Sequence, residues 1–144
     1  MAVLDEQEAT LHALLANRFD EYESKLSSLD REAANSGYNA LVGAAFAIAA
    51  DHRFPEGSKT ADIIEYVGSV RSRGEGAAQI DPQVAERVLL MVSADADVDD
   101  IDPNVQFETQ LVLLAALISD QHLNDVELDA FMSKARKLAD RWLA

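Results

Sequence analysis

The sequence contains no cysteine among its 144 residues. This absence excludes disulfide bonds, thiolate metal sites and cysteine nucleophiles. Aromatic residues are also scarce, at 6% of the chain against 49% for all hydrophobic residues. We therefore expect a core built mainly from alanine, leucine, valine and isoleucine, in which alanine lets helices approach closely. A charged fraction of 26% is not typical of a disordered chain.

Basic residues are few. The chain has 12 lysines and arginines against 26 aspartates and glutamates, which gives a formal net charge of −14. A negative field repels phosphate backbones, so we expect no nucleic-acid partner. The same field favours cations and basic protein partners. A solvated acidic surface with no further role is the alternative interpretation of this charge balance.

The sequence has no hydrophobic run long enough to cross a membrane. Its longest apolar runs, residues 40–50 and 111–118, fall short of the roughly 20 residues that span a bilayer. Asp5, Glu6 and Glu8 stand where a signal peptide would be basic. We therefore expect a cytoplasmic protein with no transmembrane segment.

Enzyme motifs are also missing. The sequence has no Gly-x-Ser-x-Gly elbow, no phosphate-binding loop and no dinucleotide fingerprint. The three histidines, His12, His52 and His122, form no His-x-x-x-His pair. His52 and His122 follow predicted helix ends, where a cation suits the helix dipole. We therefore expect a protein that is not an enzyme.

Hydrophobic spacing predicts helices throughout the chain. Within residues 1–35, apolar residues recur in steps of three and four and predict one N-terminal amphipathic helix. Further helices are expected near residues 38–51 and 60–71, then from 82, from 103 to about 120, and from 125. The sequence thus predicts a single all-α domain over residues 1–144 with about six to eight helices.

Helix starts are marked by local capping signals. Asp81-Pro82 and Asp102-Pro103 each place a side-chain acceptor before a proline at the first helical position. Their 21-residue separation (102 − 81) permits a tandem repeat, but we favour two independent starts because the flanking sequences do not match. Asn124 and Glu127 are placed to form a capping box.

Two alanine-rich helices are predicted to end at an aspartate, Asp51 and Asp120, 69 residues apart (120 − 51). A carboxylate at a helix C-terminus faces the negative end of the dipole, at a cost of about 0.3–1 kcal/mol. The favoured explanation is structural: each carboxylate accepts backbone N–H bonds in its turn. The alternative is cation binding together with Asp125 or Glu127.

An acidic segment at residues 95–102 separates two predicted helices. Asp95, Asp97 and Asp99 match positions 1, 3 and 5 of an EF-hand, but position 6 is Asp100 instead of glycine and position 12 is Gln106. The sequence therefore does not predict a regular EF-hand. A looser calcium or magnesium site and a solvated linker both stay open, and without a cation we expect the segment to be mobile. The candidate metal ligands are Asp95, Asp97, Asp99, Asp51, Asp120 and Glu127.

The repeated pattern resembles the TerB-like proteins, a helical family associated with tellurite resistance and stress response in bacteria. Its signature is an alanine-rich helix that ends in Asp-Gly, followed by a hydrophobic residue, a polar cap and a glutamate. The matching residues are 115–120 with Leu123, Asn124, Asp125 and Glu127, and 47–51 with Phe54, Pro55 and Glu56. The chain departs from the signature at both glycines, which are His52 and Gln121, and at the first glutamate, which is Ser58.

The resemblance covers residues 37–144 and implies a fold and a function. It implies a compact multi-helix array with two pseudo-symmetric helix-turn-helix halves. It also implies a non-enzymatic stress-response module that acts through protein partners and binds divalent cations. The alternative is a calcium- or magnesium-binding regulatory protein centred on residues 95–102.

Overall fold

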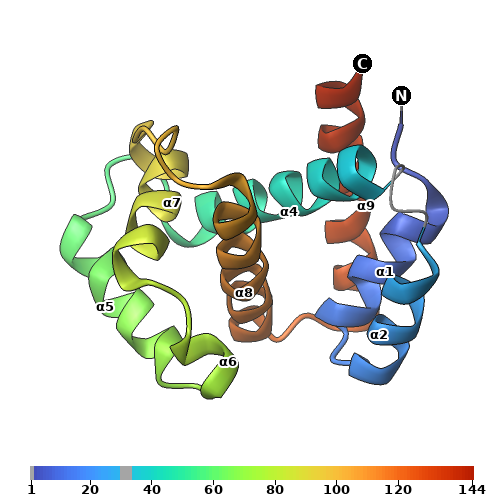
Figure 1. Cartoon of the computed structure of the whole chain (residues 1–144), viewed down its shortest axis with the longest axis horizontal. Coiled ribbons are helices and arrows are strands. Elements are labelled where there is room, and N and C mark those ends of the chain that lie inside the picture. Colours follow the sequence, from blue (N-terminus) through green and yellow to red (C-terminus); the bar gives the residue numbers. More distant parts are fainter. Residues whose placement is uncertain (1, 30–33) are drawn as a thin grey trace. The chain divides into compact units, whose positions relative to one another are not determined.

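The computed structural model describes residues 2–29 and 34–144, and these residues form helices and connecting turns without any strand. The predicted all-α class is confirmed. Figure 1 shows the elements, whose bounds follow in chain order. They are α1 (Asp5–Leu15), α2 (Phe19–Ser28), a π-helical turn η1 (Ala34–Tyr38), α4 (Asn39–Arg53), α5 (Thr60–Arg71), α6 (Glu75–Ala78), α7 (Pro82–Ala94), α8 (Pro103–Gln121) and α9 (Asp125–Leu143).

The chain divides into two compact units, each described below by itself. Unit 1 comprises Met1–Ala45 and Ile118–Ala144, and unit 2 comprises Phe46–Leu117. Among the described residues, no helix is both long enough and apolar enough to cross a bilayer.

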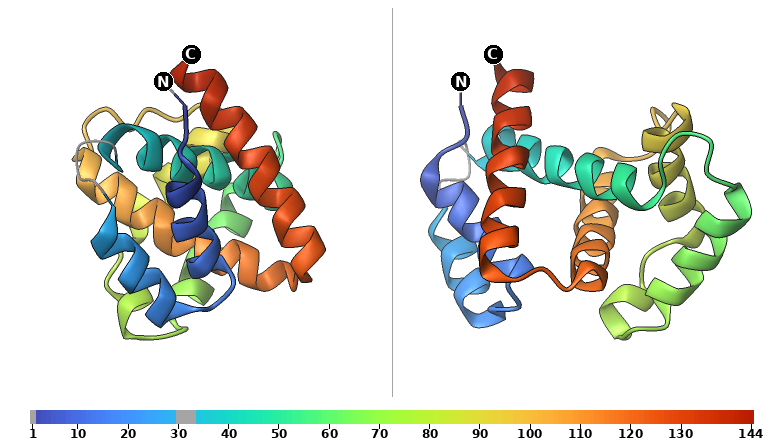
Figure 2. Two further views of the ribbon diagram at one scale, coloured as in Figure 1. Left: turned by 90° about the vertical axis from the view of Figure 1, so that its right-hand side faces the viewer. Right: turned by 180° about the vertical axis from the view of Figure 1, so that it is seen from behind.

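The N-terminal region of unit 1 contains two helices, so the prediction of one helix within residues 1–35 is wrong. The chain turns at Asn17, whose φ of 61° lies in the left-handed region that asparagine tolerates better than most residues. Helices α1 and α2 lie side by side after this turn (Figure 2). The apolar spacing continues across the turn, which is why the sequence pattern did not reveal it. Helix α2 buries none of its residues.

Helix α9 holds the N-terminal segment of unit 1. Its buried residues, Leu128, Met132, Ala135 and Ala139, recur at helical spacing and form its core face. On the flank, the Arg136 guanidinium donates from Nη1 to Asp5 and Glu8 carboxylate oxygens, each at 2.6 Å, and from Nη2 to the Val3 carbonyl at 2.6 Å. The Val3 N–H donates to Asp140 Oδ1 at 2.7 Å.

A π-helical turn, η1, precedes α4. The absent side chain of Gly37 matters here, because a Cβ at this position would collide with the side-chain amide of Gln7. Gln7 is itself buried in α1, and its Oε1 accepts the Leu4 N–H at 2.9 Å. The glycine therefore lets η1 pass close to α1.

In unit 2, α5 has the predicted bounds and buries Ile63, Tyr66, Val67 and Val70. The connection between α5 and α7 contains the short helix α6. Arg71 stabilises it, because its guanidinium donates to the Ala78 carbonyl at 3.2 Å and the Ile80 carbonyl at 3.1 Å. The sequence pattern did not reveal these longer-range bonds.

The predicted helix caps are confirmed. Asp81 Oδ1 accepts the N–H groups of Gln83 and Val84, at 2.8 and 3.1 Å, at the start of α7. At the start of α9, Glu127 N–H donates to Asn124 Oδ1 at 2.8 Å and Asn124 N–H donates to Glu127 Oε1 at 3.0 Å. The caps were predictable because each depends on residues within one helical turn.

The two predicted helix-turn-helix segments differ in their turns. Residues 54–59 separate α4 from α5, whereas residues 122–124 separate α8 from α9. Phe54 in the first turn is buried and Leu123 in the second is half-buried. The pseudo-symmetry of the two halves stays a prediction.

Candidate functional site

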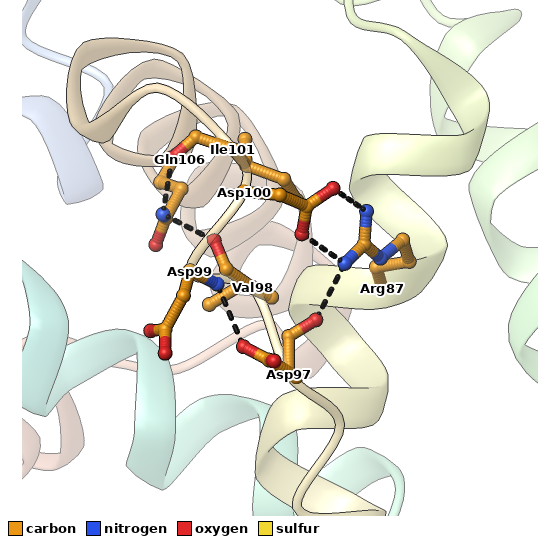
Figure 3. A network of polar contacts seen from close by, with 7 residues as sticks. All are labelled: Arg87, Asp97, Val98, Asp99, Asp100, Ile101 and Gln106. Atoms are coloured by element: carbon orange, nitrogen blue, oxygen red, sulfur yellow. Dashed lines mark hydrogen bonds and ion pairs between the residues drawn. The ribbon is translucent and has the colours of Figure 1, made fainter.

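The candidate site is the acidic loop, residues 95–102, between α7 and α8 in unit 2. Arg87 on α7 holds it through a two-point ion pair (Figure 3). Its Nη2 donates to Asp100 Oδ1 at 2.6 Å and its Nη1 donates to Asp100 Oδ2 at 3.0 Å. The same Nη2 also donates to the Asp97 carbonyl at 2.6 Å. One guanidinium thus fixes two points of the loop.

Gln106 on α8 holds the loop from the other direction. Its Nε2 donates to the carbonyls of Val98 at 2.9 Å and Ile101 at 2.8 Å (Figure 3). The side chains of Val98 and Ile101 are buried, each with 8% of its surface exposed. Two buried side chains and two hydrogen-bonding side chains therefore contact the segment that was predicted to be mobile without a cation. Its mobility stays a prediction.

Two loop carboxylates bind backbone groups. Asp97 Oδ1 accepts the Asp99 N–H at 2.8 Å, and Asp102 Oδ1 accepts the Asn104 N–H at 2.8 Å at the start of α8. Asp95 ends α7 with a left-handed φ of 54°. The side chains of all five aspartates nevertheless stay exposed to solvent.

Arg87 also sets the electrostatics of the loop. Its hydrogen bonds and positive charge lower the pKa of the Asp100 carboxyl below its ordinary value of 3.8. In return, the Asp100 carboxylate raises the pKa of Arg87. The guanidinium thus places a positive charge beside the loop carboxylates.

The predicted metal ligands do not converge. In the described part of the chain, no group of three or more histidine, aspartate or glutamate side chains is arranged to hold a metal ion. Asp97 binds its neighbouring backbone, as described above, and Asp95 caps α7. Cation binding by Asp95, Asp97 and Asp99 stays a prediction without a preformed coordination site.

The other three predicted ligands belong to elements outside the loop. Asp51 belongs to unit 2, whereas Asp120 and Glu127 belong to unit 1. The Glu127 carboxylate closes the capping box of α9. Asp120 is exposed in the last turn of α8.

The expected role of the Asp51 carboxylate as a turn acceptor stays a prediction. The hydrogen bonds that the structure shows in the turn after α4 involve other groups. The Phe54 N–H donates to the Ala50 carbonyl at 2.7 Å. The Ser58 hydroxyl donates to the Pro55 carbonyl at 2.7 Å.

Unit 1 contains a cavity of about 350 Å³ that the sequence did not predict. It lies where α1 and α8 end and where α9 begins. Asn17 and His122, two lining residues, both have left-handed backbone, with φ of 61° and 52°. The full lining consists of Leu15, Asn17, Ile118, Ser119, His122, Leu123 and Leu128.

The histidines take three different environments. His52 lies inside the last turn of α4 instead of after it, and is exposed. His12 on α1 contacts Asp129 on α9, with 3.1 Å between Nε2 and Oδ1. Only His122 occupies the turn position that the sequence predicted for it.

Comparison with known proteins adds no identity: no family model matches the sequence, and neither a curated protein nor a solved structure matches the chain. The TerB-like resemblance stays a prediction. The functional interpretation therefore depends on the geometry of the acidic loop and on the charge of the chain. Sequence analysis missed Arg87, because nothing local marks a residue 13 positions before its partner.

Proposed function

We propose that this chain is a non-enzymatic TerB-like stress-response module that acts through a protein partner, with the acidic loop as its docking surface. The observation that carries the proposal is the fixed conformation of the loop. Arg87 and Gln106 hold its backbone, while the carboxylates of Asp95, Asp99 and Asp102 face solvent. The partner segment that fits this surface is basic.

Preorganisation supports binding. A loop that is already ordered in the free protein does not lose that conformational entropy again when a partner binds. The net charge of −14 adds attraction at longer range. Such fields mainly raise the association rate of an oppositely charged partner and weaken as salt increases.

The order of the loop also separates this proposal from the calcium- or magnesium-dependent alternative. A regulatory metal site changes conformation when the ion binds, because the ion supplies contacts that are missing without it. Here Arg87 already donates to the Asp100 carboxylate, and Gln106 already donates to two loop carbonyls. A cation is therefore not needed to form these contacts.

A direct test neutralises two exposed loop carboxylates in the double variant Asp95→Asn with Asp99→Asn. Asparagine keeps the shape of both residues and accepts left-handed backbone at position 95. The matched control, Asp62→Asn with Glu65→Gln, removes the same charge from exposed positions on α5 in the same unit. Binding of a 12-residue lysine-alanine peptide is measured by calorimetry at two salt concentrations.

We expect the loop variant to bind the peptide at least about tenfold more weakly than the control variant, which corresponds to about 1.4 kcal/mol. Equal weakening in both variants would mean that only net charge matters, and the loop would not be the docking surface.

The proposed role in stress response is tested in a deletion strain challenged with tellurite. Wild type and the control should restore growth and the loop variant should not, whereas a deletion strain that grows normally would contradict this part.

A further inference from the structure

The cavity in unit 1 has an apolar floor and a polar rim. Leu15, Ile118 and Leu128 are buried side chains from α1, α8 and α9. Asn17, which follows α1, and Ser119 and His122, at the end of α8, are exposed and line the same cavity. Its volume of about 350 Å³ is within the range of small-ligand sites. The cavity thus suits an aliphatic stem with a polar head.

The helix ends favour a positive head group. Helices α1 and α8 both terminate at the cavity, and the carbonyl groups of a last helical turn carry partial negative charge. The described residues that line the cavity include no lysine or arginine. The polar side chains at the rim are the Asn17 amide, the Ser119 hydroxyl and the His122 imidazole, and the first two each carry an acceptor oxygen.

The start of α9, which also borders the cavity, has two of its N–H groups already bound within the cap. The Glu127 N–H binds Asn124 Oδ1, and the Leu128 N–H binds the Asn124 carbonyl at 2.9 Å. Residues 118–129 contain four exposed carboxylates and no lysine or arginine. These carboxylates belong to Asp120, Asp125, Glu127 and Asp129.

We propose that this cavity binds a lysine side chain of a partner protein. The stem contacts Leu15, Leu123 and Leu128, and the ammonium donates to acceptors at the rim. Lysine fits better than arginine because three rotatable donors match separate acceptors, whereas the planar guanidinium favours a paired carboxylate. This proposal goes beyond the acidic loop, since it concerns the other unit and stands even if the loop binds nothing.

The test uses a five-residue alanine peptide with one central lysine and a second peptide with norleucine at that position. Norleucine keeps the stem and removes the ammonium. Binding is followed by NMR through the methyl groups of Ile118, Leu123 and Leu128. We expect the lysine peptide to shift these resonances with millimolar affinity, on the order expected for so few contacts, and the norleucine peptide to bind at least tenfold more weakly.

Variants locate the site. Ser119→Leu fills the rim from an exposed helical position, and Ser133→Leu makes the same change on α9 away from the cavity. Asn17→Gly removes a rim amide while glycine accepts the same left-handed backbone. Ser119→Leu should abolish the shifts, Asn17→Gly should weaken binding at least threefold, and Ser133→Leu should bind as the wild type does.

Three outcomes would overturn the proposal. Equal binding of the norleucine peptide would show that the ammonium is not recognised. If Ser119→Leu binds the peptide as the wild type does, the peptide binds elsewhere. If Ser119→Leu does not fold, unchanged binding by Asn17→Gly leads to the same conclusion. Free n-butylammonium that binds as tightly as the lysine peptide would assign the cavity to a small amine instead of a protein side chain.

Discussion

Arg87 and Asp100, 13 residues apart in sequence, form a two-point ion pair with N–O distances of 2.6 and 3.0 Å. The pair connects α7 to the loop that leads into α8. A third bond from the same guanidinium reaches the Asp97 carbonyl. An arginine therefore organises an acidic segment whose sequence suggested a metal ion.

Removal of this guanidinium should loosen the loop without unfolding unit 2. In Arg87→Gln, we expect faster hydrogen exchange at the amides of Asp99 and Ile101, which bond within the loop. Lys59→Gln removes the same charge from an exposed position of unit 2 and should leave both rates unchanged. Equal exchange rates in the two variants would show that Gln106 and the buried anchors suffice.

The pH dependence of the loop follows from Asp100. Its pKa is lowered in the folded protein, so the stabilising ion pair is fully present above the ordinary value of 3.8 and is lost as the pH falls through the folded pKa. Loop amide protection should thus persist to below pH 3.8. Carboxyl NMR titration should show the Asp100 pKa rising in Arg87→Gln. An unchanged pKa would contradict the ion pair.

Replacement of Gly37 and of Gly68 by alanine should change the free energy of unfolding in opposite directions. Gly37→Ala places a Cβ against the buried Gln7 side chain, and we expect a loss of about 1–3 kcal/mol in unfolding free energy. A Cβ at Gly68 in α5 would meet no packing neighbour within 4 Å among the described residues, so Gly68→Ala should stabilise by about 0.5–1 kcal/mol through helix propensity. Urea unfolding measures both, and a neutral Gly37→Ala would refute the close approach of η1 to α1.

Arg136 should matter more for stability than its basic neighbour. Its guanidinium donates to Asp5, Glu8 and the Val3 carbonyl, so Arg136→Ala should lower the free energy of unfolding by about 1–2 kcal/mol. We expect no larger loss, because Asp5 is 96% exposed and its ion pair contributes little. Lys137 is exposed, and Lys137→Ala should change stability by less than about 0.5 kcal/mol. Thermal melts of the two variants should therefore differ. Matching melts would show that the N-terminal segment is held by its apolar contacts alone.

Local patterns predicted local structure. The cap at Asp81 and the capping box of Asn124 and Glu127 involve residues within one turn, and the spacing of Ile63, Val67 and Val70 sufficed to define α5. The turn at Asn17 escaped prediction because apolar spacing continues across it.

Longer-range contacts explain the remaining differences at the site. Arg87 and Gln106 flank the acidic loop in sequence, yet nothing in their local context marks them as its anchors. The cavity of unit 1 draws on residues from Leu15 to Leu128, so no single stretch of sequence indicates it. Charge and spacing identified residues 95–102 as a candidate site, but they did not indicate which side chains bond to its backbone.

We infer that Arg87 and Gln106, and not a metal ion, order the acidic loop. The most direct measurement is hydrogen exchange at the Asp99 and Ile101 amides of the wild type, together with its thermal melt, in chelator and in about 10 mM calcium or magnesium. We predict the same protection and the same melt in all three conditions. A cation site with a Kd of about 1 mM would instead stabilise the fold by about 1.4 kcal/mol at that concentration. Loop amides that become protected only with the cation would contradict the account.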